Sequence, residues 1–289
     1  MASLQSLIPS NLMATMFEET LRKALVLGDV VNTKYQGTIA NEGDSVTIPV
    51  IGDVTIGTHT RNETVSYENL DATNMRLVID QVRKFSIQVD RLDSKQSKID
   101  ILSAYANRAA YQMKDASDQY IAGLYTDAGI TSGLGTTAVP LEITAADTTG
   151  SYVGVYDLIS RIAKNLDEKN VPQEGRFIVV SPWLHQKFVL KGALQYTQDA
   201  QAAVNGKVGR LMGFDIRMSN NLTNAAAAGT KVISGHTDAI TFASQLLEFD
   251  TFPVLETKFG SGARGLYVYG AKVVQPSALA CATVSEGTN

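Results

Sequence analysis

Apolar and polar residues alternate over much of the stretch 35–92, which is the period of a β-strand with one buried face. The run VTIPV at 46–50 alternates in this way, and Pro49 within it favours an edge strand. A longer run has its apolar residues on one parity: Met75, Leu77, Ile79, Phe85, Ile87 and Val89. Gln81 and Arg83 occupy the same parity in its middle, so we expect a bulge or a strand break there.

After residue 93 the spacing changes to the three- and four-residue steps of a helix. The stripe consists of Leu102, Tyr105, Ala109, Met113, Ala116, Tyr120 and Leu124. Asp93 and Gln96 resemble a capping box, and Gly129 is a suitable C-terminal stop. The pattern predicts a helix over about 93–128, roughly 50 Å long. Because the stripe is narrow and rich in alanine, the helix is expected to pack closely on one side only.

The N-terminal stretch 1–34 is predicted to be an arm that ends in an amphipathic helix. Ser10 or Asn11 can cap this helix, and Gly28 and Asp29 end it. Its apolar face is formed by Leu12, Met16, Leu21, Leu25 and Val26.

The glycine- and threonine-rich stretch 129–150 marks a boundary, and the pattern beyond it is that of an α/β unit. One helix face is formed by Tyr156, Ile159, Ile162, Ala163 and Leu166. RFIVV at 176–180 is predicted to be a buried strand, and Ser181 and Pro182 are typical of the start of the next helix. From residue 254 onward strand patterns return, so the chain as a whole is predicted to be α+β.

Composition excludes several classes of protein. The 289 residues contain 29 acidic and 25 basic side chains, a net charge of −4, whereas a dedicated nucleic-acid binder carries a basic excess. Cys281 is the single cysteine, which excludes an intrachain disulfide and a cysteine-based zinc site. The chain contains no apolar run of the ~18–20 residues that a membrane helix needs, and its start lacks the pattern of a secretory leader. We therefore expect a soluble intracellular protein.

The charges are distributed unevenly between two adjacent segments. Residues 35–72 carry six acidic side chains against a single arginine, whereas residues 76–98 carry six basic side chains against three acidic ones. One interpretation is two solvated faces. The other is that the acidic segment meets the basic segment of another copy of the chain. The candidate contact residues are Glu63, Glu68, Asp71, Arg76, Arg83, Lys84 and Arg91.

No catalytic, cofactor-binding or metal-binding constellation is expected. Gly260, Gly262 and Gly265 match the spacing of a dinucleotide-binding loop, but a strand follows them where that loop needs a helix, so we interpret them as a hairpin turn. The three histidines, His59, His185 and His236, lie far apart in sequence and are expected to be exposed or hydrogen-bonded in structural roles. The protein is therefore not predicted to be an enzyme.

The order of these elements resembles the HK97-fold major capsid proteins of tailed bacteriophages, the P22-like coat proteins among them. Five segments carry the resemblance: TKYQGTIANEGDSVTIPV, KFSIQVDRLDSKQSK, VPQEGRFIVVSPWLHQKFVL, VGRLMGFDIRMSNNL and GLYVYGAKVVQPSAL. It implies an N-terminal arm (1–34), an extended E-loop (35–76), a P-domain (77–149 and 254–289) with a spine helix near 93–128, and an α/β A-domain (150–253).

The resemblance also implies a function and partners. The chain would be a coat protein that assembles as pentamers and hexamers, in the host cytoplasm, into an icosahedral head that encloses double-stranded DNA. The arm lacks the long scaffolding segment of the best-known family member, so a separate scaffolding protein is expected, with a portal and, where present, a decoration protein. No lysine lies between Lys34 and Lys84, which argues against covalent cross-linking through an E-loop lysine.

Three alternatives remain at this point. An encapsulin-type compartment would have the same fold but enclose a cargo protein. A tail-tube protein is disfavoured by the long helix and the α/β unit. A two-domain α/β enzyme would require His185 or His236 to converge with carboxylates in one pocket.

Overall fold

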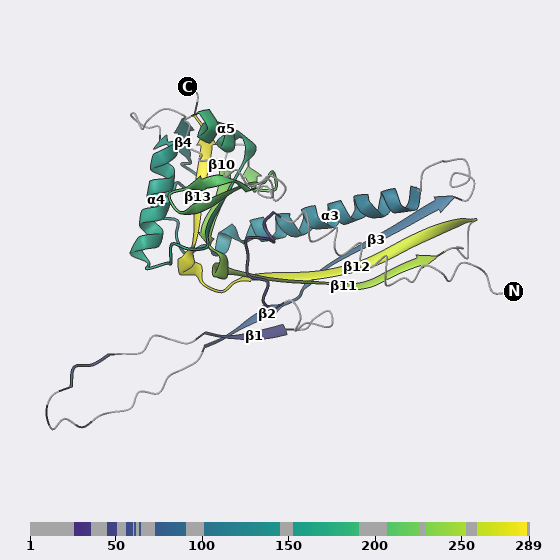
Figure 1. Cartoon of the computed structure of the whole chain (residues 1–289), viewed down its shortest axis with the longest axis horizontal. Helices are drawn as coiled ribbons and strands as arrows, with labels where there is room; N and C mark the ends of the chain where they lie inside the picture. Colours follow the sequence, from purple (N-terminus) through teal and green to yellow (C-terminus); the bar gives the residue numbers. More distant parts are fainter. Residues whose placement is uncertain are drawn as a thin grey trace.

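The computed structural model shows an elongated subunit in which a body at one end is continuous with a long, thin layer (Figure 1). The described residues are 26–35, 45–50, 56–59, 61, 64, 73–90, 101–144, 153–190, 207–225, 229–252 and 259–287. Of the sequence predictions, the arm helix over 12–25 and the capping box at Asp93 lie outside these residues.

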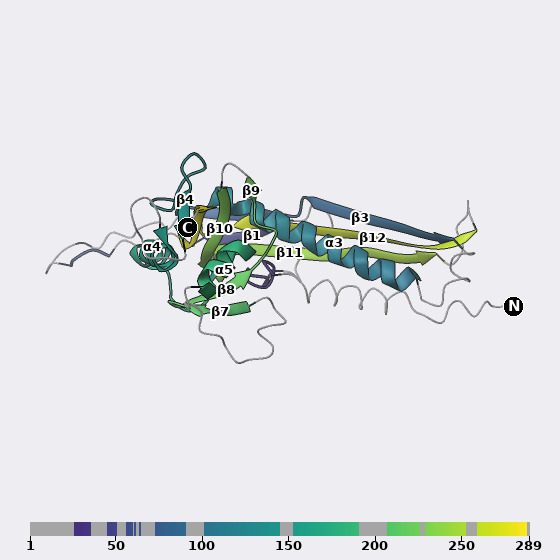
Figure 2. The same cartoon turned by 90° about the horizontal axis from the view of Figure 1, so that it is seen from above.

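The layer consists of an antiparallel sheet and one helix. Its strands are β11 (Ile240–Phe252), β12 (Gly260–Val273) and β3 (Gln81–Asp90), in that order, and α3 (Ile101–Gly123) lies along one face, as Figures 1 and 2 show. Tyr267 and Tyr269 of β12 are fully buried beneath the helix, and Tyr120 of α3 meets Tyr269 edge-on at 5.5 Å between ring centroids. Since side chains alternate between the faces of a strand, every second residue of β3 and β12 faces away from α3.

The long helix is confirmed, but two of its predicted features are wrong. It ends at Gly123 and continues as the 3-10 helix η2 (Leu124–Asp127), before the predicted stop at Gly129. Its buried stripe passes through Ala110 and Ser117, both fully buried, while Tyr105 is 50% exposed. Ser117 is tolerated in this stripe because its hydroxyl donates to the carbonyl oxygens of its own preceding turn. Because the prediction considered apolar residues alone, the predicted stripe lies slightly to one side of the buried stripe.

A two-stranded ribbon packs against the other face of the layer where the layer joins the body. It consists of β1 (Ser45–Val50) and β2 (Thr73–Val78), paired antiparallel, so Pro49 lies in an edge strand as predicted. A strand break occurs at residues 79–80, between β2 and β3, just before the expected position, because Gln81 and Arg83 lie within β3. The small core beneath the ribbon is formed by Ile48, Leu77, Ile79, Ala243 and Val268.

The body contains the large sheet and the α/β unit. The strand order is β5 (Val153–Gly154), β4 (Leu141–Thr144), β13 (Leu279–Glu286), β10 (Gly229–His236), β6 (Arg176–Val180), β8 (Phe214–Met218) and β7 (Lys207–Leu211), with β9 (Asn224–Ala225) paired to β10. The helices are α4 (Val155–Glu168) and α5 (Pro182–Leu190), and short 3-10 turns η3 (Thr237–Ala239) and η4 (Pro276–Ala278) join the sheets.

The sequence predictions for the body are largely confirmed. RFIVV forms β6, which is buried at all five positions, and α5 begins at Pro182. The helix face of α4 is buried at Ile159, Ile162 and Leu166. Strand pairing also links distant parts of the chain, because the C-terminal β13 lies between β4 and β10. The core is therefore continuous from the body into the layer.

Candidate inter-subunit surfaces

The predicted contact residues that the structure describes lie on β2 and β3. Arg76 is exposed on β2 opposite Thr47 of the ribbon, and its carbonyl oxygen accepts a hydrogen bond from the Lys272 ammonium at 3.3 Å. Arg83 and Lys84 are exposed on β3. Glu63, Glu68, Asp71 and Arg91 lie outside the described residues.

Arg83 and Lys84 are neighbours in sequence but face opposite sides of the layer. Arg83 lies on the side of α3, where its Nε donates to the hydroxyl of Tyr269 at 3.3 Å, and this hydrogen bond raises the pKa of the Arg83 guanidinium. Lys84 faces the side without a helix. Neither Lys84 nor Arg76 forms an ion pair with a described residue. Of the predicted basic residues that the structure describes, these two are therefore best placed to meet an acidic partner.

The face of the layer opposite α3 is open beyond the ribbon. The exposed side chains of β3 on this face are Lys84, Ser86, Gln88 and Asp90. Across the sheet from Ser86, Arg264 of β12 forms an ion pair with Asp250 of β11 at 2.8 Å, and its guanidinium lies 4.9 Å from the ring centroid of Phe252. In this way a polar row and one aromatic ring cross the open face.

The Arg264–Asp250 pair was missed in the sequence because a bulge in β11 changes its parity. The register shifts between Leu246 and Glu248, so Asp250 falls on the same face as Arg264. The clue was that residues of one parity change from apolar, Phe242 and Leu246, to acidic, Glu248 and Asp250, within a single strand.

On the outer side of the layer, α3 itself presents exposed residues. Tyr111 is 65% exposed and Tyr105 is 50% exposed, with Arg108 exposed between them. β3 and β11 are the two edge strands of the sheet. The layer thus leaves an open face, two sheet edges and a helix surface, whereas a subunit that works alone covers more of such surface.

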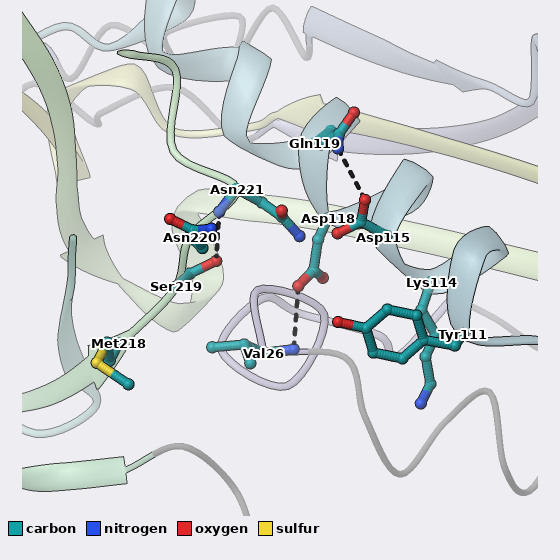
Figure 3. Close-up of a pocket in the computed structure, with 10 residues that line it drawn as sticks. All are labelled: Val26, Tyr111, Lys114, Asp115, Asp118, Gln119, Met218, Ser219, Asn220 and Asn221. Carbon is teal, nitrogen blue, oxygen red and sulfur yellow. Dashed lines mark hydrogen bonds between the residues drawn. The ribbon is translucent and has the colours of Figure 1, made fainter. Parts of the chain in front are cut away.

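The end of the arm is attached to α3 beside a cavity of about 570 Å³ (Figure 3). The backbone N–H of Val26 donates to Oδ2 of Asp118 at 3.3 Å. Asp118 is 4% exposed, and burial raises the pKa of its carboxyl to about 7, although the backbone N–H groups of residues 26–28 oppose this rise. Burial likewise lowers the pKa of the neighbouring Lys114. The carboxylate therefore fixes the point at which the arm meets the helix.

Two buried cations of the body have structural partners. The Lys231 ammonium donates to the hydroxyls of Thr137 at 2.8 Å and Thr283 at 2.9 Å, and lies over the ring of Tyr125. Arg176 is 3% exposed and is held by the carboxylate of Asp167 and by two carbonyl oxygens. These contacts link separate elements of the body and offer no open reaction centre.

In the described part of the chain, His236 lies beside the carboxylate of Asp238 at 3.6 Å, whereas the enzyme alternative requires a histidine that converges with several carboxylates. His59 is exposed, and the buried Nε2 of His185 has no hydrogen-bond partner. His236 and Asp238 both line a cavity of about 340 Å³, but Nδ1 of His236 accepts the backbone N–H of Asp238 and so caps the turn η3. Among the described residues no group of three metal-ligating side chains was found.

The interpretation of the three glycines as a hairpin turn is wrong. Gly260, Gly262 and Gly265 lie inside β12 and pair with β3. A Cβ at Gly265 would lie 2.2 Å from the ring of Phe85, and one at Gly260 would lie 2.4 Å from the carbonyl oxygen of Val89. The glycines therefore allow close contact with β3.

Within the described residues no helix is long and apolar enough to cross a membrane.

Comparison with known proteins shows which family shares this architecture. The model of a family described as phage capsid protein matches residues 54–282. The chain belongs to this phage capsid protein family. The curated proteins contain no match to it.

Solved capsid structures share the fold of this capsid protein over most of its length. A structure from Mycobacterium phage Che8 has 25% identity and a TM-score of 0.67 and covers 88% of this chain and 89% of its own. The capsid of the cyanophage P-SCSP1u has 17% identity and a TM-score of 0.63, with coverages of 89% and 86%. A virus-like particle from Pyrococcus furiosus has 11% identity and a TM-score of 0.55, with coverages of 93% and 97%.

These similarities confirm the predicted resemblance, fold class and general function. The chain is a major capsid protein with the HK97-type fold, a structural protein of the virion that self-assembles into the capsid shell. The open surfaces of the layer are accordingly candidate contacts between copies.

Proposed function

We propose that this capsid protein forms the pentamers and hexamers of an icosahedral head that encloses double-stranded DNA, and that it has no catalytic role. The supporting observation is the one-sided layer, in which α3 covers one face of the sheet and the other face stays open beyond the ribbon. Neighbouring copies can cover such a surface in a closed shell. The slightly acidic chain also suits a container that holds DNA by enclosure.

In this proposal the parts of the subunit have the roles expected from the resemblance. Residues 1–34 are the arm, 35–76 the E-loop around the ribbon, 77–149 with 254–289 the P-domain, and 150–253 the A-domain around the capsomer centre. Assembly takes place in the host cytoplasm with a separate scaffolding protein and a portal protein, and a decoration protein is a further candidate partner.

Sedimentation of the purified full chain, with and without its scaffolding protein, tests this proposal. We expect closed shells or capsomer rings in negative-stain images, and shells from infected cells that contain DNA. Shells that contain a host protein and no DNA would favour the encapsulin-type alternative. A chain that stays monomeric under both conditions would contradict the proposal.

The acidic E-loop residues are proposed to contact the basic residues of adjacent copies. Glu63, Glu68 and Asp71 would meet Arg76, Lys84 and Arg91. The contact with Arg83 would be weaker, because the hydroxyl of Tyr269 already holds its guanidinium. Each exposed pair contributes only about 0–1 kcal/mol. The pairs therefore determine how neighbouring copies align, because they are repeated around the shell.

Charge reversal tests this contact directly. We expect Glu63→Lys, Glu68→Lys and Asp71→Lys together to reduce assembly at low salt, and Arg76→Glu with Lys84→Glu to restore it. Reversal of three exposed body acids, Glu142, Glu168 and Glu174, is the control for net charge. Unchanged assembly of the triple variant, or an equal loss in the control, would refute the pairing.

A further inference from the structure

β11 and β3 form the two edges of the layer sheet, and β11 has two features that hinder pairing with a further strand. Its register shifts between Leu246 and Glu248, and the backbone of Asn32 exchanges hydrogen bonds of 2.9 Å with Ile240 and Phe242. β3 instead pairs with β12 in an unbroken register over its whole length and contains neither proline nor glycine. Since bulges, prolines and covering segments are means by which sheets block their edges, the outer edge of β3 remains suited to pairing.

The outer edge of β3 also carries apolar side chains that its own chain covers incompletely. Figure 2 shows β3 along the border of the layer, and α3 runs obliquely from it toward the side of β11. Within the described part of the chain, no strand pairs with the outer side of β3. Phe85 and Ile87 are only partly buried on the α3 side of this strand. A further strand beside β3 would cover both side chains.

The residues of β3 match those of a second β3 that runs in the opposite direction. We propose that β3 pairs antiparallel with β3 of a second copy, about a two-fold axis at Ile87, so that the two layers join into one continuous sheet. Such a contact is isologous, because the same surface of both copies takes part. The proposal requires self-assembly of the chain and goes beyond the arrangement of copies in capsomers.

The apolar face of β3 fits this register. With the axis at Ile87, the two Ile87 side chains lie opposite each other, and Phe85 of each copy lies opposite Val89 of the other. All these residues are on the side of α3, so both helices stay on the same side of the joined sheet. Directly opposite side chains in an antiparallel pair are about 4.5–5.5 Å apart at Cβ, which allows apolar contact.

The polar face fits the same register. Ser86 of each copy lies opposite Gln88 of the other, and Lys84 lies opposite Asp90, so both ends of the pair have complementary charge. A lysine on an edge strand usually discourages pairing, but in this register it faces an acidic side chain.

A neighbouring register lacks this agreement. An axis at Ser86 would place Asp90 opposite Val82 and Arg83 opposite Val89, so that charged and apolar side chains face each other. The proposed register also leaves the open face of the sheet available, because backbone groups at the edge make the pairing. The E-loop contact proposed above can therefore form in the same shell.

Cross-linking of single-cysteine variants tests the pairing in the full-length chain under assembly conditions. Native Cys281 is 5% exposed and burial raises its pKa to about 11, so cysteines introduced at exposed positions should react selectively with an ethylene-bridged bis-maleimide. The variants are Lys84→Cys and Asp90→Cys, assembled separately and as a mixture. In the proposed register the two different positions lie opposite each other, whereas identical positions are about 20 Å apart.

We expect cross-linked dimers to form at least severalfold faster in the mixture than with either variant alone. Each variant alone is the control for contacts elsewhere in the shell. Dimers that form equally fast with one variant alone would show a different register or a different interface, and would overturn the proposal. The absence of dimers from the mixture would also overturn it.

Exchange of the two charges gives a second, independent measurement. Lys84→Asp places like charges opposite each other at both ends of the pair, and we expect a severalfold lower yield of shells at low salt. Adding Asp90→Lys to this variant restores complementary charges between copies and should raise the yield again.

The comparison of these two variants isolates the strand pairing. Both the single variant Lys84→Asp and the double variant lack the contact of Lys84 with acidic E-loop residues, so the difference between their yields comes from the β3 pair. A double variant that assembles no better than Lys84→Asp would contradict the pairing, whatever the fate of the E-loop contact.

Discussion

The body and the layer are both built on sheets, but they cover these sheets differently. In the body, the central strands β6 and β10 are buried at nearly every position. In the layer, β3 alternates between partly buried and exposed residues, because α3 covers one face and the ribbon covers only the end of the other. The comparison shows that the central strands of the body are covered by the chain's own residues, whereas β3 of the layer keeps exposed side chains that other copies can cover.

Buried charge provides the largest contrast between the two regions. Arg176 in the body lies against the carboxylate of Asp167, whereas Asp118 in the layer receives backbone N–H groups, and burial raises its pKa from 3.8 to about 7. Between these two values the folded chain binds a proton that the unfolded chain does not. The stability from this group is therefore present below about pH 4 and is lost as the pH rises toward 7.

We predict that Asp118→Asn removes this decline, which amounts to at most about 4 kcal/mol across that range. Urea unfolding of the unassembled subunit at several pH values measures it. Asp115→Asn, a neighbour on the same helix, is the control and should keep the wild-type slope. A wild-type slope in Asp118→Asn would show that other groups, such as Asp29, whose pKa burial also raises, cause the pH dependence.

Loss of an arginine should also affect the free energy of unfolding differently in the two regions. Arg176→Ala in the body leaves buried carbonyl groups without a donor, and we expect a loss of about 2–4 kcal/mol in the free energy of unfolding. Arg264→Ala on the open face removes an exposed pair with Asp250 and should cost less than about 1 kcal/mol. Urea unfolding of both variants tests the difference, and similar losses would contradict it.

The smallest expected effect concerns two glycines in close contacts. A Cβ at Gly235 of β10 would lie 2.4 Å from the carbonyl oxygen of Ala278, which is backbone and cannot move easily. A Cβ at Gly265 of β12 meets the ring of Phe85, which is only partly buried and can turn aside. We expect Gly235→Ala to cost about 1–3 kcal/mol and Gly265→Ala less, measured by thermal unfolding. The reverse order would mean that the layer is packed as rigidly as the body.

Much of the fold followed from local patterns. The alternation at 46–50, the break between β2 and β3, the buried strand RFIVV and the helix that begins at Pro182 were all predictable, since each depends on the spacing of a few neighbouring residues. The candidate contact surface was only partly predictable. Arg83 and Lys84 appeared equivalent in sequence, but the layer turns them to opposite sides and places Arg83 against Tyr269.

The sequence by itself therefore determined the elements, their order and the imbalance of charge, which together identified the type of subunit. Only the tertiary structure decided which surfaces stay open. Three results depend on residues far apart in the chain: the attachment of Val26 to Asp118, the pairing of Asp250 with Arg264 across a bulge, and the close contact of Gly265 with Phe85. Local spacing carries no information about such contacts, because they arise only when separate elements pack together.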